Sequence, residues 1–154
     1  MKKIIILFSL WLLLLPGHAE AVYQVGDRID ETLAEQLQIT RGVAVVNFFA
    51  SWCLSCKKEQ PLIQGISTAL AQRGIRLLGI DTDEQLKEGV AFQKALGLTY
   101  PILNDNNQQI VARFGPLGMP AFYYLKERTI VKMRLGAVDQ IDQVILSDLK
   151  ELAP

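Results

Sequence analysis

Short apolar runs alternate with amphipathic stretches along the chain, and this alternation predicts a sheet covered by helices. Val43–Ala50 (VAVVNFFA) and Ile75–Ile80 (IRLLGI) are rich in β-branched and aromatic residues, as in strands buried on both faces. Between them, Cys53–Ala71 repeats apolar residues at helical spacing. We expect the two strands to pair in parallel, because the helix between them carries the chain back across the sheet.

The rest of the chain predicts further helices and a hairpin. Thr82 followed three residues later by Gln85 has the spacing of a capping box, which predicts a helix start at Thr82. Ala121–Lys126 and Thr129–Leu135 indicate two antiparallel strands. The other predicted elements are a helix at Thr32–Leu37, an extended piece at Tyr100–Leu103, a short helix ending at Phe114 and a helix at Val138–Leu152. Together they predict one α/β domain with a mixed sheet.

The first 21 residues have the layout of a secretory signal peptide. Lys2 and Lys3 precede the apolar run Ile4–Leu15, and Ala19-Glu20-Ala21 places small residues where a signal peptidase cuts. The run is shorter than the roughly 20 apolar residues that cross a bilayer. We expect cleavage after Ala21, with an uncleaved anchor at residues 4–15 as the alternative. Either way, residues 22–154 are expected to form one domain in the periplasm.

The overall composition excludes several classes of protein. Lysine plus arginine equals aspartate plus glutamate, 16 against 16, so the basic excess of a phosphate-neutralising nucleic-acid binder is missing. Half of the residues are apolar, which excludes a disordered chain. The single histidine, His18, lies in the predicted signal peptide.

The two cysteines lie where the first long helix is predicted to begin. Cys53 and Cys56 are separated by two residues. At a helix start, unpaired backbone N–H groups and the helix dipole stabilise an anion, which lowers the pKa of a thiol there. Cys56, one turn further, can attack a mixed disulfide formed at Cys53. The pair therefore predicts redox chemistry.

Other uses of a CxxC pair need residues that this chain lacks. Structural zinc takes about four Cys or His ligands. Covalent haem attachment needs a histidine after the second cysteine, where Lys57 stands. A purely structural disulfide remains open, although so small a ring would stabilise the fold little. We expect no metal and no dissociable cofactor.

The stretch VVNFFASWCLSCKKEQP resembles the thioredoxin-like thiol–disulfide oxidoreductases of the bacterial envelope, above all the reductases of cytochrome c maturation. The residues that carry the resemblance are Trp52, Cys53, Cys56, Lys57, Glu59 and Pro61, followed later by Phe114–Pro120 (FGPLGMP) and the strand AFYYL. The resemblance implies a thioredoxin-like three-layer sandwich with a central mixed sheet flanked by helices. It also implies that Pro120 is cis and faces Cys53, with Met119 and Trp52 contacting substrate.

The resemblance further implies an acidic residue that takes the proton of Cys56. Counting back from Tyr100-Pro101 places it at Glu84. Asp81 and Asp83 follow the same predicted strand and are alternatives, and all three could instead cap a helix. Glu59, by contrast, is expected to be solvated.

The predicted function is the reduction of disulfides in exported proteins by a Cys53/Cys56 dithiol. The resemblance implies that a membrane thiol donor returns electrons to the enzyme, and we expect a monomer. An oxidase or isomerase of the same fold is the near alternative. A thiol-based copper carrier or a client-holding protein is the alternative from another class, because two thiolates suit Cu(I).

Overall fold

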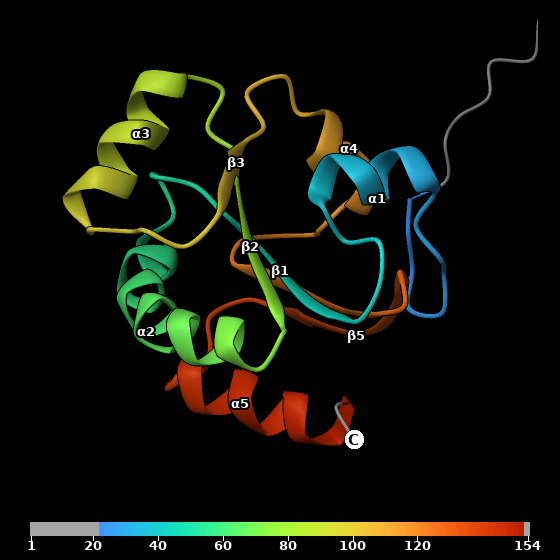
Figure 1. Cartoon of the computed structure of the whole chain (residues 1–154). Coiled ribbons are helices and arrows are strands. Elements are labelled where there is room, and N and C mark those ends of the chain that lie inside the picture. The colour runs from blue at the N-terminus through green and yellow to red at the C-terminus, as the bar shows by residue number, and fades with distance from the viewer. Residues whose placement is uncertain (1–21, 153–154) are drawn as a thin grey trace, which may run out of the picture.

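The computed structural model describes residues 22–152, and these residues fold into a mixed sheet between two layers of helices (Figure 1). The signal peptide predicted for residues 1–21 lies outside the described residues. In chain order the elements are α1 (Glu31–Leu37), β1 (Val43–Phe49), α2 (Leu54–Gln72), β2 (Arg76–Asp81), α3 (Leu86–Ala95), β3 (Ile102–Asn104), α4 (Gln109–Phe114), β4 (Ala121–Lys126), β5 (Thr129–Leu135) and α5 (Ile141–Leu152).

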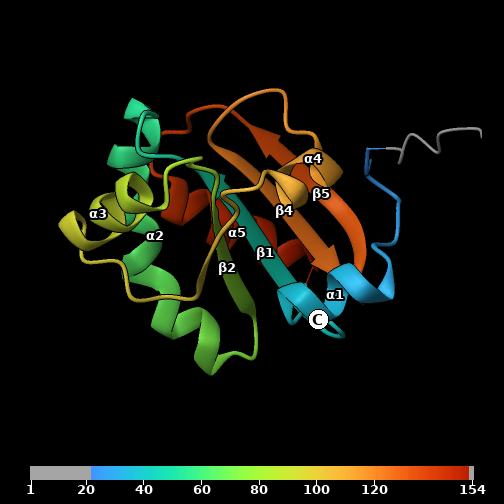
Figure 2. The same ribbon diagram turned by 90° about the horizontal axis from the view of Figure 1, so that it is seen from above.

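The strand order within the described sheet is β3-β2-β1-β4-β5, which puts β1 at its centre. β1 pairs in parallel with β2, and β2 with β3, whereas β4 runs antiparallel to both β1 and β5. Seen from above, α1 and α4 lie over the sheet and α5 lies beneath it (Figure 2). The predicted three-layer α/β sandwich with a mixed sheet is confirmed.

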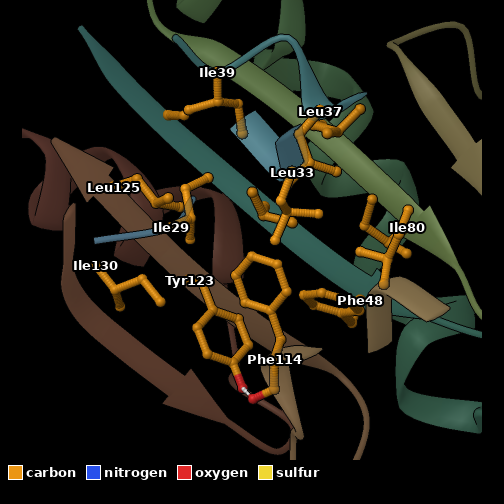
Figure 3. Close-up of a cluster of buried hydrophobic side chains, with 14 of the residues drawn as sticks. Ile29, Leu33, Leu37, Ile39, Phe48, Ile80, Phe114, Tyr123, Leu125 and Ile130 are labelled. Atoms are coloured by element: carbon orange, nitrogen blue, oxygen red, sulfur yellow. Dashed lines mark hydrogen bonds between the residues drawn. The ribbon is translucent and has the colours of Figure 1, made fainter. Parts of the chain in front are cut away.

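An aromatic cluster fills the space between the sheet and the α1/α4 layer. The rings of Phe48, Phe114 and Tyr123 lie with centroids 4.9 to 5.6 Å apart (Figure 3). Tyr123 is buried, and its hydroxyl donates to the carbonyl oxygen of Phe114 at 3.0 Å. This bond satisfies a polar group that would otherwise be costly to bury. The cluster anchors α4 against β1 and β4, the two strands whose adjoining loops form the site described below.

Two predicted helix starts are wrong, and both errors have the same cause. α3 begins at Leu86 rather than at Thr82, because the Thr82 hydroxyl and N–H donate to the carbonyl oxygen of Phe49. α5 begins at Ile141 rather than at Val138, whose N–H donates to the Glu59 carboxylate. In each case a long-range hydrogen bond holds the residue outside the helix.

Candidate active site

The two cysteines form a disulfide at the junction between β1 and α2. The S–S distance is 2.05 Å and the Cα–Cα distance is 5.2 Å. Ala50, Ser51 and Trp52 make the tight turn between the two elements, and Cys53 is the N-cap residue of α2. The sequence therefore places a redox-capable pair at a helix N-terminus, as predicted.

The two sulfurs differ in their access to solvent and in their hydrogen bonds. The Cys53 residue is 5% exposed, whereas Cys56 is fully buried. Cys53 Sγ accepts a hydrogen bond from the Cys56 backbone N–H at 3.1 Å and lies 3.5 Å from the Ser55 hydroxyl. The same donors would stabilise a thiolate at Cys53. This asymmetry is consistent with the predicted roles of Cys53 as the attacking sulfur and Cys56 as the resolving one, and these roles stay a prediction.

The loop before β4 lies against the disulfide. The Met119–Pro120 peptide bond is cis, as the family resemblance implied. Met119 packs on the apolar cluster that contains Phe49, Cys53 and Cys56. The structure thus brings together two motifs that are far apart in the sequence.

Exposed apolar side chains lie next to Cys53 in the chain and in the loop before β4. Trp52 is 67% exposed, and Leu54 and Leu117 are more exposed still. Large apolar side chains left in water near a reactive group are typical of a surface that contacts another molecule. A cavity of about 320 Å³ opens beside Trp52, and its lining residues are Trp52, Thr82, Asp83, Glu84, Gln85, Glu88, Gln108 and Met119. Trp52, Glu84 and Met119, all predicted site residues, therefore share one cavity.

The three candidate acids occupy different environments. Glu84 is exposed on the cavity wall, whereas Asp81 and Asp83 are buried. Burial raises the pKa of Asp81 to about 6, although hydrogen bonds from the Asp83 N–H and the Gln93 amide oppose the rise. Within residues 22–152, no hydrogen bond joins any of these carboxylates to a cysteine sulfur in the oxidised state. The role of Glu84 stays a prediction.

Glu59 is buried, and its expected exposure to solvent is wrong. The residue is only 4% exposed, and one carboxylate oxygen accepts the Val138 N–H at 2.7 Å. The other oxygen is buried and has no hydrogen-bond partner among the described residues. Burial raises the pKa of this carboxyl, with the hydrogen bond from Val138 acting against the rise. The carboxylate ties α2, one turn beyond Cys56, to the loop before α5.

A buried polar network between β1 and α2 was not predicted from the sequence. The Gln60 side-chain amide donates to Asn47 Oδ1 at 2.7 Å and accepts from the Tyr100 hydroxyl at 2.5 Å. Both amide residues are fully buried. Asn47 interrupts the apolar run VAVVNFFA, and a polar residue at such a position signals a buried partner. The network joins β1, α2 and the segment before β3.

Comparison with known proteins assigns the chain to a family. The family model described as "AhpC/TSA family" matches residues 26–134. The chain belongs to the AhpC/TSA family. Among curated relatives, the thiol-disulfide oxidoreductase ResA of Bacillus anthracis is 26% identical over 121 residues, covering 77% of this chain and 69% of that protein. The resemblance to thioredoxin-like thiol–disulfide oxidoreductases is therefore confirmed.

Solved structures of other proteins confirm the fold. A secreted Mycobacterium tuberculosis disulfide oxidoreductase homologous to E. coli DsbE aligns with a TM-score of 0.61 at 23% identity, covering 70% of this chain and 84% of that one. A cysteine-to-serine mutant of Xylella fastidiosa PrxQ aligns with a TM-score of 0.74 at 17% identity, covering 87% of this chain and 99% of that one.

Residues 22–152 contain no cluster of three or more His, Cys, Asp or Glu side chains placed to hold a metal ion. No helix in the same part of the chain combines the length and the apolar character needed to cross a bilayer.

Proposed function

We propose that this member of the AhpC/TSA family is a protein-disulfide reductase that acts on exported polypeptides. The observation that carries the proposal is the Cys53–Cys56 disulfide at the N-terminus of α2, where Cys53 is the less buried of the two cysteines and lies beside the exposed Trp52 and the Met119–Pro120 turn. An enzyme that works on folded or extended proteins needs a sulfur close to an apolar contact surface, and the slight exposure of Cys53 next to the exposed Trp52 fits this requirement.

The reaction balances as two successive thiol–disulfide exchanges. In the reduced enzyme, the Cys53 thiolate attacks one sulfur of the client disulfide, forms a mixed disulfide and releases the first client thiolate. Cys56 then loses its proton and attacks Cys53 Sγ, which releases the second client thiolate and closes the Cys53–Cys56 disulfide. The client gains two electrons, and its two thiolates take up the proton that Cys56 released and one proton from water. The enzyme ends in the oxidised state that the structure shows.

The site residues divide the work of this cycle. The N-cap position and the N–H of Cys56 stabilise the Cys53 thiolate, which raises the fraction of the attacking form at neutral pH. Trp52 and Met119 contact the client chain next to its disulfide, and Pro120 shapes the turn that presents Met119. Glu84, on the wall of the same cavity, takes the proton from Cys56 when the mixed disulfide resolves.

The cellular location of the enzyme and its source of electrons are part of the same proposal. The pattern of residues 1–21 supports export across the inner membrane, with residues 22–154 acting in the periplasm. That compartment is kept oxidising, so the enzyme needs a thiol donor in the membrane to reopen its disulfide after each turnover.

Exchange with a model client tests the activity. Reduced protein is mixed with a peptide that contains one disulfide, and the reaction is quenched in acid and alkylated. We expect the peptide to gain two alkyl groups for every enzyme molecule that loses two. A peptide that stays oxidised while the enzyme stays reduced would overturn the proposal.

Glu84→Gln tests the proposed proton acceptor. Because the amide cannot accept the Cys56 proton, we expect resolution of the mixed disulfide to slow by about 10²-fold, with attack by Cys53 unchanged. Stopped-flow measurement over a range of pH separates the two steps. Glu35→Gln, which removes an exposed carboxylate on α1, is the control. Equal resolution rates in Glu84→Gln and wild type would remove Glu84 from the mechanism.

A further inference from the structure

The turn that presents Cys53 is held by a carboxylate from the neighbouring strand. Asp83 follows the end of β2, and Ser51 lies in the turn between β1 and α2. One oxygen of the Asp83 carboxylate accepts the Ser51 backbone N–H at 2.8 Å, and the other accepts the Ser51 hydroxyl at 2.8 Å. Both oxygens are thus used on a single residue, two positions before the attacking cysteine.

The Asp83 carboxylate is itself firmly placed. The residue is 3% exposed, its backbone N–H donates to Asp81 Oδ1 at 3.0 Å, and its carbonyl oxygen accepts from the Asn106 amide at 3.1 Å. The preceding residue, Thr82, donates its N–H to the carbonyl oxygen of Phe49 at 2.9 Å. These hydrogen bonds fix the backbone on both sides of the group, and a side chain locked in this way can hold a loop in one geometry.

The geometry of this turn aligns Cys53 Sγ with the backbone N–H that would stabilise its thiolate form. The Cys53 N–H donates to the carbonyl oxygen of Ala50 at 3.2 Å, which closes the turn directly after Ser51. The closed turn aims Cys53 Sγ at the N–H of Cys56, 3.1 Å away. A turn released from Asp83 would sample other geometries, and the sulfur would lose part of this alignment.

We propose that Asp83 is a positioning residue of the redox site, which acts through Ser51 to hold Cys53 Sγ against its hydrogen-bond donors. The proposal rests on the proposed function and deepens it, because it names a residue on which the reactivity of the attacking thiol depends. The direct effect of a negative charge on Asp83 is to destabilise a nearby thiolate, which raises the pKa of the Cys53 thiol. By holding the turn, Asp83 instead stabilises the Cys53 thiolate and lowers that pKa. The two effects have opposite signs, and this difference makes the proposal testable.

The pKa of the Cys53 thiol in Asp83→Asn is the measurement that separates these effects. An amide is uncharged and has one acceptor oxygen, so the bond from the Ser51 N–H loses its charge assistance and the Ser51 hydroxyl must turn to accept from the NH₂ group, which weakens the hold on the turn. We expect the pKa of Cys53, followed by thiolate absorbance in the reduced protein, to rise by about 1. At a pH below that pKa, alkylation of Cys53 by iodoacetamide then slows about tenfold. Ser51→Ala, which removes only the hydroxyl, should show a smaller rise of the same sign.

Glu35→Gln, which removes a remote exposed carboxylate, should leave the pKa of Cys53 unchanged. An unchanged pKa in Asp83→Asn with reduced thermal stability would mean a purely structural role, and a lowered pKa would mean a direct charge effect; either result overturns the proposal. If Asp83→Asn does not fold, the Ser51→Ala value decides in the same way. Because the titration needs no client, it also stands if the exchange assay with the peptide fails.

Discussion

Replacing Cys53 with serine will reduce disulfide exchange to the uncatalysed background, whereas replacing Cys56 with serine will trap the enzyme on its clients. The first variant lacks the sulfur of the less buried cysteine, and a hydroxyl cannot attack a disulfide at neutral pH. The second variant keeps the attacking thiol but has no group to resolve the mixed disulfide. The two variants therefore fail at different steps.

Non-reducing electrophoresis and intact mass spectrometry distinguish the two failures. With a disulfide peptide as client, Cys56→Ser should accumulate a covalent adduct that dithiothreitol releases, and Cys53→Ser should form none. Ser67→Ala, also on α2, keeps both cysteines and should behave as wild type. Turnover in either cysteine variant, or an adduct in Cys53→Ser, would contradict the assignment of attacking and resolving sulfurs.

Removing the carboxylate of Asp148 should destabilise the fold strongly, because it would break two ion pairs at once. This carboxylate on α5 is 3% exposed and accepts from Lys132 Nζ and Arg134 Nε, each at 2.5 Å, on β5. Asp148→Ala would leave two partly buried cations close together without an anion between them. We expect the free energy of unfolding at pH 7 to fall by about 3 kcal/mol. Chemical denaturation measures this loss.

The pH dependence of stability checks the same ion pairs. Burial alone would raise the pKa of Asp148, but the hydrogen bonds from Arg134 and Lys132 outweigh it and hold the pKa well below its usual value. A group with a lowered folded pKa stabilises the fold above its unfolded pKa of about 4 and loses that contribution as the pH falls. Wild type should therefore lose stability below about pH 4, and Asp148→Asn should lose less. Asp142→Asn, on the same helix but outside this cluster, is the control. An identical acid dependence in Asp148→Asn and wild type would contradict the account.

The fold and the reactive pair could be predicted because both rest on local patterns. Apolar runs such as Val43–Ala50 indicate central strands whatever surrounds them, and a CxxC after such a run marks a helix start. The bounds of β4 and β5 matched their predicted ranges for the same reason.

The rest depended on contacts between residues distant in sequence. The burial of Glu59 depends on Val138, 79 positions away, and the carboxylate that holds Ser51 comes from Asp83, 32 positions away. A capping-box spacing at Thr82 could not reveal that its hydroxyl bonds to β1 instead. Spacing along the chain carries no information about such partners. The sequence could therefore name Asp81, Asp83 and Glu84 as candidate acids, but it could not say which contacts each of them makes.

A redox titration of the Cys53–Cys56 pair tests the central claim most directly. The chain has two cysteines, so alkylation after equilibration in defined thiol buffers counts open and closed disulfide without ambiguity. In a reductase, the disulfide should open in one reversible two-electron transition with a midpoint potential of about −270 mV. A disulfide that stays closed in every buffer, or a midpoint potential of about −120 mV as in a strong oxidant, would contradict the account.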